Sequence, residues 1–391
     1  MSRFLFVALP LSGHLNPMLA IARLLIHSGH EVVWCGPESV LRPLVGPDVP
    51  VHPTGVRTYR RPADTGAAGL VALWDGYLIP FTRFTLAPVD AAVSAYRPDV
   101  VVAEQYALSG AVVAHRRGLP WATVCTGALE LAPPPELPAF AEIVTDRLAT
   151  VRTVAGLPAD ESFDPRFSPH LVLALTTPGL MGGTPLPDRC VLTGAVLGER
   201  LNTPDFPWQE WDPGRRHVLV TVGTLVGHLI GDFYQRMAAA LAPMAREVQA
   251  VFVTSGIAGD GFPDNVIARE LVPMLDLLPQ LDAVVCHAGG VAHEALANGV
   301  PMVVAPVRAE QVAVARQVVD AGAAVEVSIL DASVAELAAA VRAVLDEPDY
   351  RGHAERLADE FAAAGGARAA AAELTALASG VDAAATAKAG G

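Results

Sequence analysis

A histidine stands directly after the first apolar run of this chain, in the segment Ser12-Gly13-His14 that follows Phe4 to Leu9. A neutral imidazole at the end of a buried strand can take a proton from a hydroxyl group near neutral pH, which is the chemistry of a general base. A histidine that only hydrogen-bonds its own turn gives the same pattern. On the residues alone, both interpretations of His14 stay open.

Glu104 follows another apolar run, Asp99 to Ala103, in the same relative place. Two strand-end loops of one parallel sheet can converge, so His14 and Glu104 can form a histidine–carboxylate pair, in which the carboxylate raises the basicity of the imidazole. The alternative is an exposed glutamate that opens a helix, where its charge favours the helix dipole. Taken alone, Glu104 fits the alternative better.

The strongest cluster follows the apolar run Ala283 to Cys286 and reads His287-Ala288-Gly289-Gly290. Glycines let backbone N–H groups approach an anion, and the dipole of a following helix favours negative charge. His287 can donate to a phosphate oxygen, and Glu294 in the following helix can accept from ribose hydroxyls. A simple turn with a helix cap would explain this segment if it stood alone.

The segment does not stand alone, because Glu310 and Gln311 follow the next apolar run. A carboxylate beside an amide is typical of a site that binds sugar hydroxyls. Loops of this kind at successive strand ends predict a ligand site.

The elements that must position these residues repeat a strand–helix–strand pattern twice. In the first half, the spacing predicts a helix with Asn16 as its N-cap and Pro17 at its first position. Short apolar and β-branched-rich runs predict parallel strands; they are Phe4–Leu9, Glu31–Cys35, Asp99–Ala103, Trp121–Cys125, His217–Val222, Gln249–Thr254, Ala283–Cys286 and Met302–Ala305. The fold class expected is α/β, with two doubly wound, Rossmann-like domains.

The expected domain boundaries follow from changes in composition. Residues 1–200 form the first domain, the Pro- and Trp-rich stretch 201–215 is a linker, and residues 216–365 form the second domain. Residues 366–391 are expected to form a C-terminal helix that returns toward the first domain and ends in a frayed tail.

Composition excludes several classes of protein. The 391 residues are 52% apolar and carry a formal net charge of −14, which argues against nucleic acid or an anionic membrane as partner. The four cysteines are widely separated and form no CxxC pair, so no zinc site or disulfide framework is expected. This pattern favours a reducing cytoplasm as the location of the protein. No uninterrupted apolar run reaches about 18 residues, so no membrane span is expected.

Several segments occur in one order along nearly the whole chain, and together they carry a resemblance. They are GHLNP at 13–17, GPES at 36–39, VTVGT at 220–224, VPMLDLLPQLDAVVCHAGG at 272–290 and HEALANGVPMVVAP at 293–306, followed by Glu310-Gln311. This set resembles the family 1 glycosyltransferases of the GT-B architecture, and most closely their bacterial antibiotic- and macrolide-modifying members. The resemblance implies two Rossmann-like domains that face a cleft, with the acceptor bound mainly by the first and the nucleotide sugar by the second.

The resemblance also implies roles for individual residues. His14 matches the general base of the family, and Glu104 matches its supporting acid, where an aspartate is more usual. For the donor, loops near phosphate or base match Gly223-Thr224 and Ser255, and the base contact matches Val272. The diphosphate loop matches His287, Gly289, Gly290 and Val291. The ribose contact matches Glu294, and the contacts of the transferred sugar match Glu310 and Gln311.

The acceptor region expected from the residues is the apolar stretch 71–87, together with 133–140. Its aromatic side chains Trp74, Tyr77 and Phe81 either contact the acceptor or belong to the core.

Two positions depart from the pattern of the family. The HxGxGT or HxGxNS loop reads His287-Ala-Gly-Gly-Val291-Ala292 here, one residue shorter before Glu294 and without a Thr or Ser hydroxyl. Glu310 stands where an aspartate is common, and its extra methylene changes the reach toward the sugar.

The function expected is that of an inverting, metal-independent glycosyltransferase that moves a sugar from a UDP- or TDP-sugar to a small, largely apolar acceptor. The nucleotide sugar is a co-substrate, no cofactor is expected, and the protein is expected to be a monomer or homodimer. A GT-B sugar-nucleotide epimerase and a non-catalytic helper protein of the same fold are the alternatives. A nicotinamide dehydrogenase is disfavoured because no GxGxxG follows an expected strand.

Overall fold

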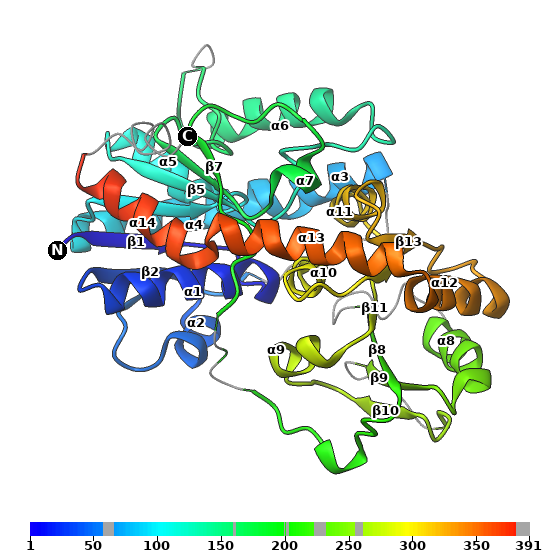
Figure 1. Ribbon diagram of the computed structural model, residues 1–391. Coiled ribbons are helices and arrows are strands. Elements are labelled where there is room, and N and C mark those ends of the chain that lie inside the picture. Colours follow the sequence, from blue (N-terminus) through cyan, green and yellow to red (C-terminus); the bar gives the residue numbers. More distant parts are fainter. Residues whose placement is uncertain are drawn as a thin grey trace. The chain divides into compact units, whose positions relative to one another are not determined.

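The computed structural model describes residues 1–57, 66–158, 162–198, 200, 203–222, 232–254 and 261–380 (Figure 1). The chain divides into two compact units. Unit 1 comprises Met1–Thr177, Gly183–Leu201 and Ala363–Gly391, and unit 2 comprises Pro178–Gly182 and Asn202–Ala362. Thus the chain leaves unit 1 for a five-residue excursion at Pro178 and returns to it at Ala363.

Unit 1 is built on a seven-stranded sheet in the order β3-β2-β1-β4-β5-β6-β7, and every neighbouring pair of strands is parallel. The central strands are continuous apolar runs because helices cover both faces of a parallel sheet. The strands are β1 (Arg3–Val7), β2 (Glu31–Gly36), β3 (Val51–Pro53), β4 (Val100–Glu104), β5 (Trp121–Cys125), β6 (Leu171–Ala174) and β7 (Cys190–Leu192).

The first helix begins earlier than the sequence predicts. Helix α1 spans Ser12–His27, so the Ser12-Gly13-His14 segment is its first turn and Pro17 lies inside it, not at its first position. The N–H groups of His14 and Leu15 both donate to the carbonyl of Leu11, at 2.9 Å, and these bonds start the helix. Proline removes one backbone donor, a loss that the burial of the apolar stripe of α1 offsets.

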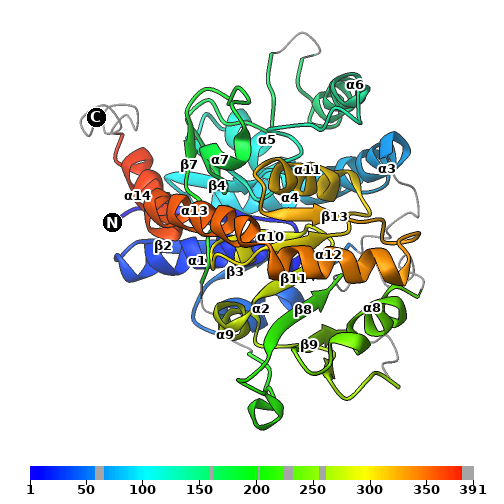
Figure 2. The ribbon, with the colours of Figure 1, turned by 45° about the vertical axis from the view of Figure 1, so that its right-hand side comes forward.

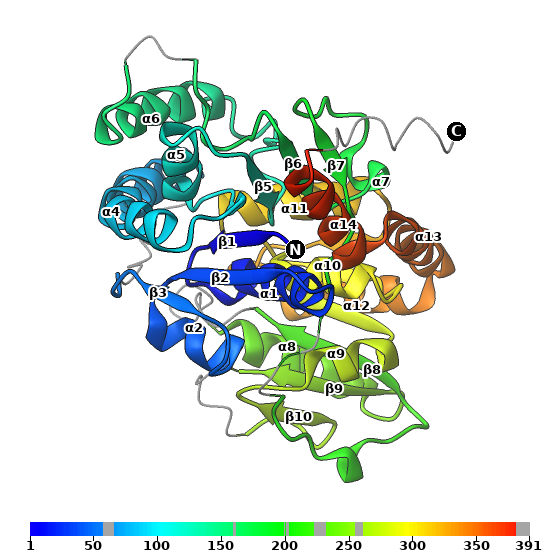
Figure 3. The ribbon, with the colours of Figure 1, turned by 90° about the vertical axis from the view of Figure 1, so that its left-hand side faces the viewer.

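The other helices of unit 1 connect its strands or pack beside them. They are α2 (Glu38–Val45), α3 (Gly66–Leu73), a π-helix at Trp74–Leu78, α4 (Ile79–Tyr96), α5 (Leu108–Arg116), α6 (Phe140–Val154) and α14 (Gly366–Ala378). Helix α14 packs beside α1 although the two are far apart in sequence (Figure 3). Phe4 and Phe6 of β1, Met18 of α1 and Leu374 of α14 share one buried cluster.

Unit 2 has a six-stranded sheet in the order β10-β9-β8-β11-β12-β13, and its neighbouring strands are also all parallel (Figure 2). The strands are β8 (Arg216–Thr221), β9 (Val248–Val253), β10 (Val266–Arg269), β11 (Ala283–Cys286), β12 (Met302–Val304) and β13 (Ala324–Glu326). The sequence predicts β8, β9, β11 and β12 within one residue at each end, but not β10 or β13.

The α-helices of unit 2 are α7 (Pro178–Met181), α8 (Phe233–Leu241), α9 (Met274–Leu277), α10 (Gly290–Leu296), α11 (Ala309–Asp320), α12 (Val334–Asp346) and α13 (Pro348–Ala364). Helices α8 and α12 pack together, and their apolar side chains share a buried cluster with β8 and β9. No helix among the described residues is long and apolar enough to span a bilayer.

Both sheets have the doubly wound strand order expected from the sequence, so the expected fold class is confirmed. In each sheet the strand order reverses at one point, between β1 and β4 in unit 1 and between β8 and β11 in unit 2. Ligands of open α/β sheets bind outside the carboxyl ends of the strands at this switch point. His14 and Glu104 flank the switch point of unit 1, and His287 follows a strand at the switch point of unit 2.

Candidate functional site

The switch point of unit 1 brings a histidine and a carboxylate into contact. His14 lies in the first turn of α1, and Glu104 is the last residue of β4, with a side chain that is 0% exposed. His14 Nδ1 is 2.9 Å from Glu104 Oε1. Glu104 is therefore not the exposed glutamate at the start of a helix that its sequence context alone favours.

The hydrogen bonds of Glu104 fix the orientation of the imidazole. A carboxylate can only accept, so the contact requires the proton of His14 on Nδ1, which leaves the lone pair on Nε2. The other oxygen of Glu104, Oε2, accepts from the backbone N–H of Tyr106 at 3.1 Å. Both carboxylate oxygens are thus held, and the side chain of His14 remains 21% exposed for contact with a ligand.

A third side chain, that of Thr126, completes this cluster. Its hydroxyl donates to Glu104 Oε1 at 2.9 Å and lies 3.1 Å from His14 Nδ1. No motif in the sequence points to Thr126, although it directly follows β5 just as Glu104 ends β4. The rule that polar residues at carboxyl ends of parallel strands meet would have found it.

The cluster of His14, Glu104 and Thr126 can act as a general base. The carboxylate stabilises the positive charge that the imidazole acquires when it takes a proton, and its burial strengthens this interaction. The hydroxyl of Thr126 shares the negative charge of Glu104 and limits its rotation.

The switch point of unit 2 carries the loop that begins at His287, directly after β11. Ala288 has φ +57°, a left-handed conformation that non-glycine residues seldom adopt. Gly289 caps α10, and a β-carbon at this position would lie 2.5 Å from His287 Nε2. The imidazole therefore lies against the backbone of Gly289, and only glycine permits this close approach.

The remaining expected donor-binding residues lie around this loop or on neighbouring elements of unit 2. Gly290, Val291 and Glu294 belong to α10, and Val272 is buried just before α9. Glu310 lies in the first turn of α11.

The side chain of Gln311 forms hydrogen bonds to the backbone at the start of helix α11. Its Oε1 accepts from the backbone N–H groups of Val307 at 2.9 Å and Arg308 at 3.1 Å, which caps helix α11. The amide oxygen of Gln311 is thus engaged by the backbone.

The expected acceptor side chains Trp74, Tyr77 and Phe81 are buried, with exposed fractions of 0%, 1% and 2%. Tyr77 and Phe81 pack ring against ring at 5.4 Å. Their contact with an acceptor stays a prediction. Gly223, Thr224 and Ser255 lie outside the described residues. Within the described part of the chain, no group of three or more His, Cys, Asp or Glu side chains is arranged to hold a metal ion.

Comparison with known proteins finds relatives of this chain over most of its length. Residues 238–377 match the family model described as erythromycin biosynthesis protein CIII-like, C-terminal domain. The chain is 30% identical to 4'-demethylrebeccamycin synthase of Lentzea aerocolonigenes, over 93% of this chain and 96% of the relative. It is 29% identical to the elloramycin glycosyltransferase of Streptomyces olivaceus, over 92% and 93% of the two chains.

Solved structures share the fold over nearly the full length. The glycosyltransferase of kitacinnamycin superposes with a TM-score of 0.81 at 25% identity and covers 96% of this chain and 99% of its own. A spinosyn rhamnosyltransferase solved with thymidine diphosphate gives a TM-score of 0.73 at 24% identity, covering 96% of this chain and 100% of its own.

Proposed function

The chain belongs to the GT-B glycosyltransferases of antibiotic and related natural-product pathways, and from this premise we propose that it is an inverting, metal-independent enzyme. It moves a sugar from a UDP- or TDP-sugar to a hydroxyl of a small, largely apolar acceptor. The observation that carries the proposal is the contact of His14 with the buried carboxylate of Glu104.

In the proposed reaction, Nε2 of His14 takes the proton of the acceptor hydroxyl as the oxygen attacks the anomeric carbon. The attack comes from the face opposite the diphosphate, so the configuration at the anomeric carbon inverts. The bond from this carbon to the diphosphate oxygen breaks, and its electron pair leaves with the nucleotide. The imidazolium that results is stabilised by Glu104, whose Oε1 accepts from Nδ1.

The proposed donor site is in unit 2, around the loop 287–290. Backbone N–H groups of Gly289 and Gly290, together with the side chain of His287, stabilise the charge that develops on the leaving diphosphate. The close approach of His287 to Gly289 keeps the imidazole and the backbone donors on one small surface. These groups neutralise the leaving group, so the proposed reaction needs no metal ion.

Further donor contacts complete the proposal. Glu294 binds the ribose, Glu310 and Gln311 the transferred sugar, and Val272 the base. The residues outside the described part of the chain, Gly223, Thr224 and Ser255, are assigned to phosphate or base. Trp74, Tyr77 and Phe81 form the apolar acceptor side. Trp74 and Tyr77 belong to the π-helix of unit 1, a kind of distortion that is frequent at functional sites, and Phe81 follows it in α4.

The test combines transfer and binding. Purified protein is incubated with TDP-glucose or UDP-glucose and 4-methylumbelliferone, a planar phenol whose fluorescence is lost when its hydroxyl is glycosylated. We expect fluorescence loss and the β-glycoside, read from the coupling of the anomeric proton, with no change on addition of EDTA. His14→Ala slows the transfer by about two to four powers of ten. His27, an exposed histidine at the end of the same helix, gives the control, and His27→Ala leaves the transfer unchanged.

Three outcomes would contradict parts of the proposal. An α-glycoside would exclude inversion, and loss of transfer with EDTA would exclude metal independence. Conversion of the free sugar nucleotide without any acceptor would favour the epimerase.

A further inference from the structure

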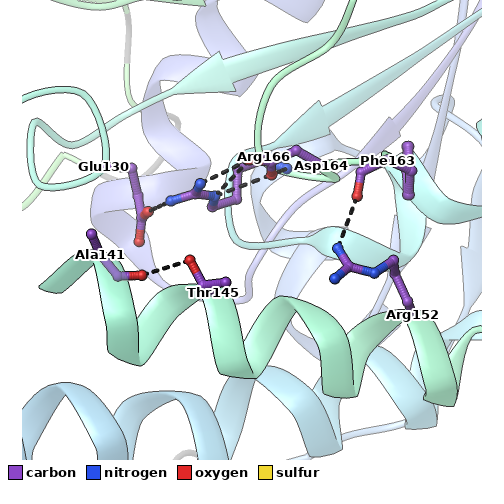
Figure 4. Close-up of polar contacts among 7 residues, drawn as sticks. All are labelled: Glu130, Ala141, Thr145, Arg152, Phe163, Asp164 and Arg166. Atoms are coloured by element: carbon purple, nitrogen blue, oxygen red, sulfur yellow. Dashed lines mark hydrogen bonds and ion pairs between the residues drawn. The ribbon is translucent and has the colours of Figure 1, made fainter. Parts of the chain in front are cut away.

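A buried ion pair connects the loop that follows β5 with the segment that precedes β6. The side chain of Glu130 is 0% exposed, and its Oε2 accepts from Arg166 Nη1 at 2.5 Å. Arg166 also donates to both carboxylate oxygens of Asp164, from Nη2 to Oδ2 at 2.8 Å and from Nε to Oδ1 at 3.1 Å (Figure 4). Because two carboxylates hold one guanidinium, the direction of the Arg166 side chain is fixed.

Arg166 belongs to a segment that is itself attached to the core of unit 1. Two residues later, the hydroxyl of Ser168 donates to the carbonyl of Trp121 in β5 at 2.5 Å. The backbone N–H of Ser168 donates to Thr123 Oγ1 in the same strand at 3.0 Å. Phe163, three residues before Arg166, packs edge to face on Trp121, with ring centroids 6.4 Å apart. The segment thus provides a fixed support for the guanidinium.

On the other side of the ion pair, Glu130 lies in the loop 126–139 between β5 and α6. The turn around Glu130 is closed by a local hydrogen bond, in which the N–H of Ala132 donates to the carbonyl of Ala128 at 2.8 Å. A local bond shapes the turn but does not attach it to the rest of the fold. The contact of Glu130 with Arg166 bridges 36 residues of sequence, so it fixes the loop to its support.

The two ends of this loop lie in different parts of the proposed site. At its start, Thr126 directly follows β5 and donates to Glu104 Oε1 at 2.9 Å, so Thr126 is held independently of Glu130. The stretch 133–140, which the sequence predicts to contact the acceptor, forms the end of the loop and the first residue of α6. Glu130 lies between the two ends and attaches this second part of the loop to the core.

Helix α6 connects the stretch 133–140 to the aromatic side chains of the expected acceptor region. Arg147 of α6 donates twice to Asp75, from Nη2 to Oδ2 at 2.9 Å and from Nε to Oδ1 at 3.2 Å. Asp75 lies in the π-helix, directly after Trp74 and two residues before Tyr77. The parts of unit 1 that are expected to bind the acceptor are therefore joined in the fold, although they are far apart in the sequence.

We propose that Arg166 is a positioning residue for acceptor binding: by holding Glu130, it keeps the stretch 133–140 ordered on the acceptor side of unit 1. The inference rests on the proposed function, because it takes the expected acceptor region as its premise. A loop that is ordered before binding lowers the entropy lost when a ligand binds, so the ion pair contributes to acceptor affinity.

Three variants remove the contact in different ways. Arg166→Met leaves Glu130 as a buried carboxylate without its counterion, which drives this side chain out of its place. Glu130→Leu removes the carboxylate and leaves Arg166 bound to Asp164. The double variant leaves no buried charge unpaired, and apolar residues often replace a buried ion pair without loss of stability, so it stays informative if a single variant does not fold.

Two further variants serve as controls. Glu130→Gln is the conservative one, because its amide oxygen can still accept from Arg166. Arg117→Met removes another ion pair of unit 1, in which Arg117 donates to the exposed carboxylate of Asp90 from Nε at 2.7 Å and from Nη2 at 2.5 Å. That pair contacts neither the loop 126–139 nor α6.

With TDP-glucose saturating, we expect KM for 4-methylumbelliferone to rise about tenfold in the three variants that remove the contact, because binding must then order the stretch 133–140. We expect kcat to stay within about twofold of wild type, because the contact of His14 with Glu104 does not involve the ion pair. Glu130→Gln and Arg117→Met keep both quantities within about twofold of wild type. Equilibrium dialysis of 4-methylumbelliferone without donor gives Kd, which rises by the same factor as KM.

Unchanged KM and Kd for the acceptor in the double variant would overturn the inference. A fall of kcat at unchanged acceptor KM would overturn it as well, because a merely structural contact lowers the fraction of active protein and leaves KM as it is. The same holds for equal acceptor KM in Glu130→Gln and Glu130→Leu, since the hydrogen bond to Arg166 would then not matter. Failure of the proposed function looks different: His14→Ala then retains transfer, whatever the variants of the ion pair do.

Discussion

The two switch points of this protein occupy equivalent places in their sheets and are equipped differently. In unit 1, Val7 at the end of β1 is in register with Ala103, and Glu104 follows. In unit 2, Thr221 at the end of β8 is in register with Cys286, and His287 follows. Glu104 and His287 are therefore topological equivalents, one residue beyond the same register position.

Around these positions, unit 1 relies on side chains and unit 2 on the backbone. Glu104 is fully buried and held by His14, Thr126 and Tyr106. His287 is partly exposed and precedes the left-handed Ala288 and the sterically required Gly289. A proton acceptor needs a nearby charge in a dry setting, whereas an anion site needs backbone N–H groups that no side chain covers. The same fold can therefore provide either kind of site, depending on the residues at the end of one strand.

The largest effect on activity is expected for the substitution of His14, at the switch point of unit 1. We expect His14→Ala to lower kcat by about two to four powers of ten, the usual contribution of a general base. The affinity for UDP and TDP should stay unchanged, because the proposed donor loop 287–290 is in unit 2. Initial rates and calorimetry on the same preparation measure both quantities. Near-full activity of this variant would remove the distinction between the two switch points.

His287→Ala tests the other side of the comparison. We expect nucleotide binding to weaken by about 1.5–3 kcal/mol, the range for a hydrogen bond to a charged group. The shortened loop has no hydroxyl that could share the charge of the diphosphate, so only the backbone N–H groups of Gly289 and Gly290 remain to hold it. Calorimetric titration with UDP and TDP measures it, and His353→Ala, on α13, serves as the control. Equal affinities of wild type and His287→Ala would show that this loop does not bind phosphate.

A pH-dependent stability is expected of unit 2, from His293 on α10. Burial lowers the pKa of His293 from its ordinary value of 6.5 to about 4. In the unfolded chain, His293 binds a proton as the pH falls below about 6.5. In the folded protein it binds that proton only near pH 4. Stability is therefore fully present above pH 6.5 and is lost as the pH falls toward 4, by about 1–3 kcal/mol in total.

Urea unfolding at pH 7 and pH 5 measures this loss. In His293→Asn the difference between the two pH values becomes smaller. An undiminished difference would show that other groups cause the acid sensitivity.

Thr126→Val tests whether the hydroxyl of Thr126 orients the carboxylate of Glu104 in unit 1. Valine keeps the shape of threonine but cannot donate to Glu104. We expect kcat to fall about tenfold, which corresponds to the lower end of the range for one lost hydrogen bond to a charged group. Thr126→Ser restores the hydroxyl and should restore kcat. If valine and serine perform alike, the hydroxyl is not what orients the carboxylate.

The smallest effect is expected at Ala288. Ala288→Gly relieves the left-handed strain and should raise the free energy of unfolding by about 0.5–1 kcal/mol, because the strain outweighs the added freedom of the unfolded chain. Thermal unfolding with and without TDP measures it.

Gly289→Ala, at the next residue, tests the close approach of His287 to the backbone. The added β-carbon displaces His287, so we expect nucleotide binding to weaken whether or not stability changes. Tight TDP binding by Gly289→Ala would contradict the role of the close approach.

The sequence predicts the strands at the two switch points well, because buried parallel strands are short apolar runs that end at polar loops. The expected strands Phe4–Leu9 and Ala283–Cys286 correspond to β1 and β11 in the structure. The start of α1 is predicted wrongly. Asn16 and Pro17 have the features of a helix start, yet bonds to the Leu11 carbonyl begin the helix at Ser12. Edge strands such as β3 and β13 are only three residues long and give no periodic signal of their own.

What the sequence determined by itself is the kind of residue at each strand end: a histidine after β1, a carboxylate at β4, and a histidine with two glycines after β11. What only the tertiary structure decided is which of them meet. His14 and Glu104 are 90 residues apart, and their contact at 2.9 Å follows from the adjacency of β1 and β4 in the sheet order. The burial of Glu104 and the approach of Thr126 likewise depend on strand pairing and loop packing. No local pattern of residues specifies these, because they arise from contacts between segments that are distant in sequence.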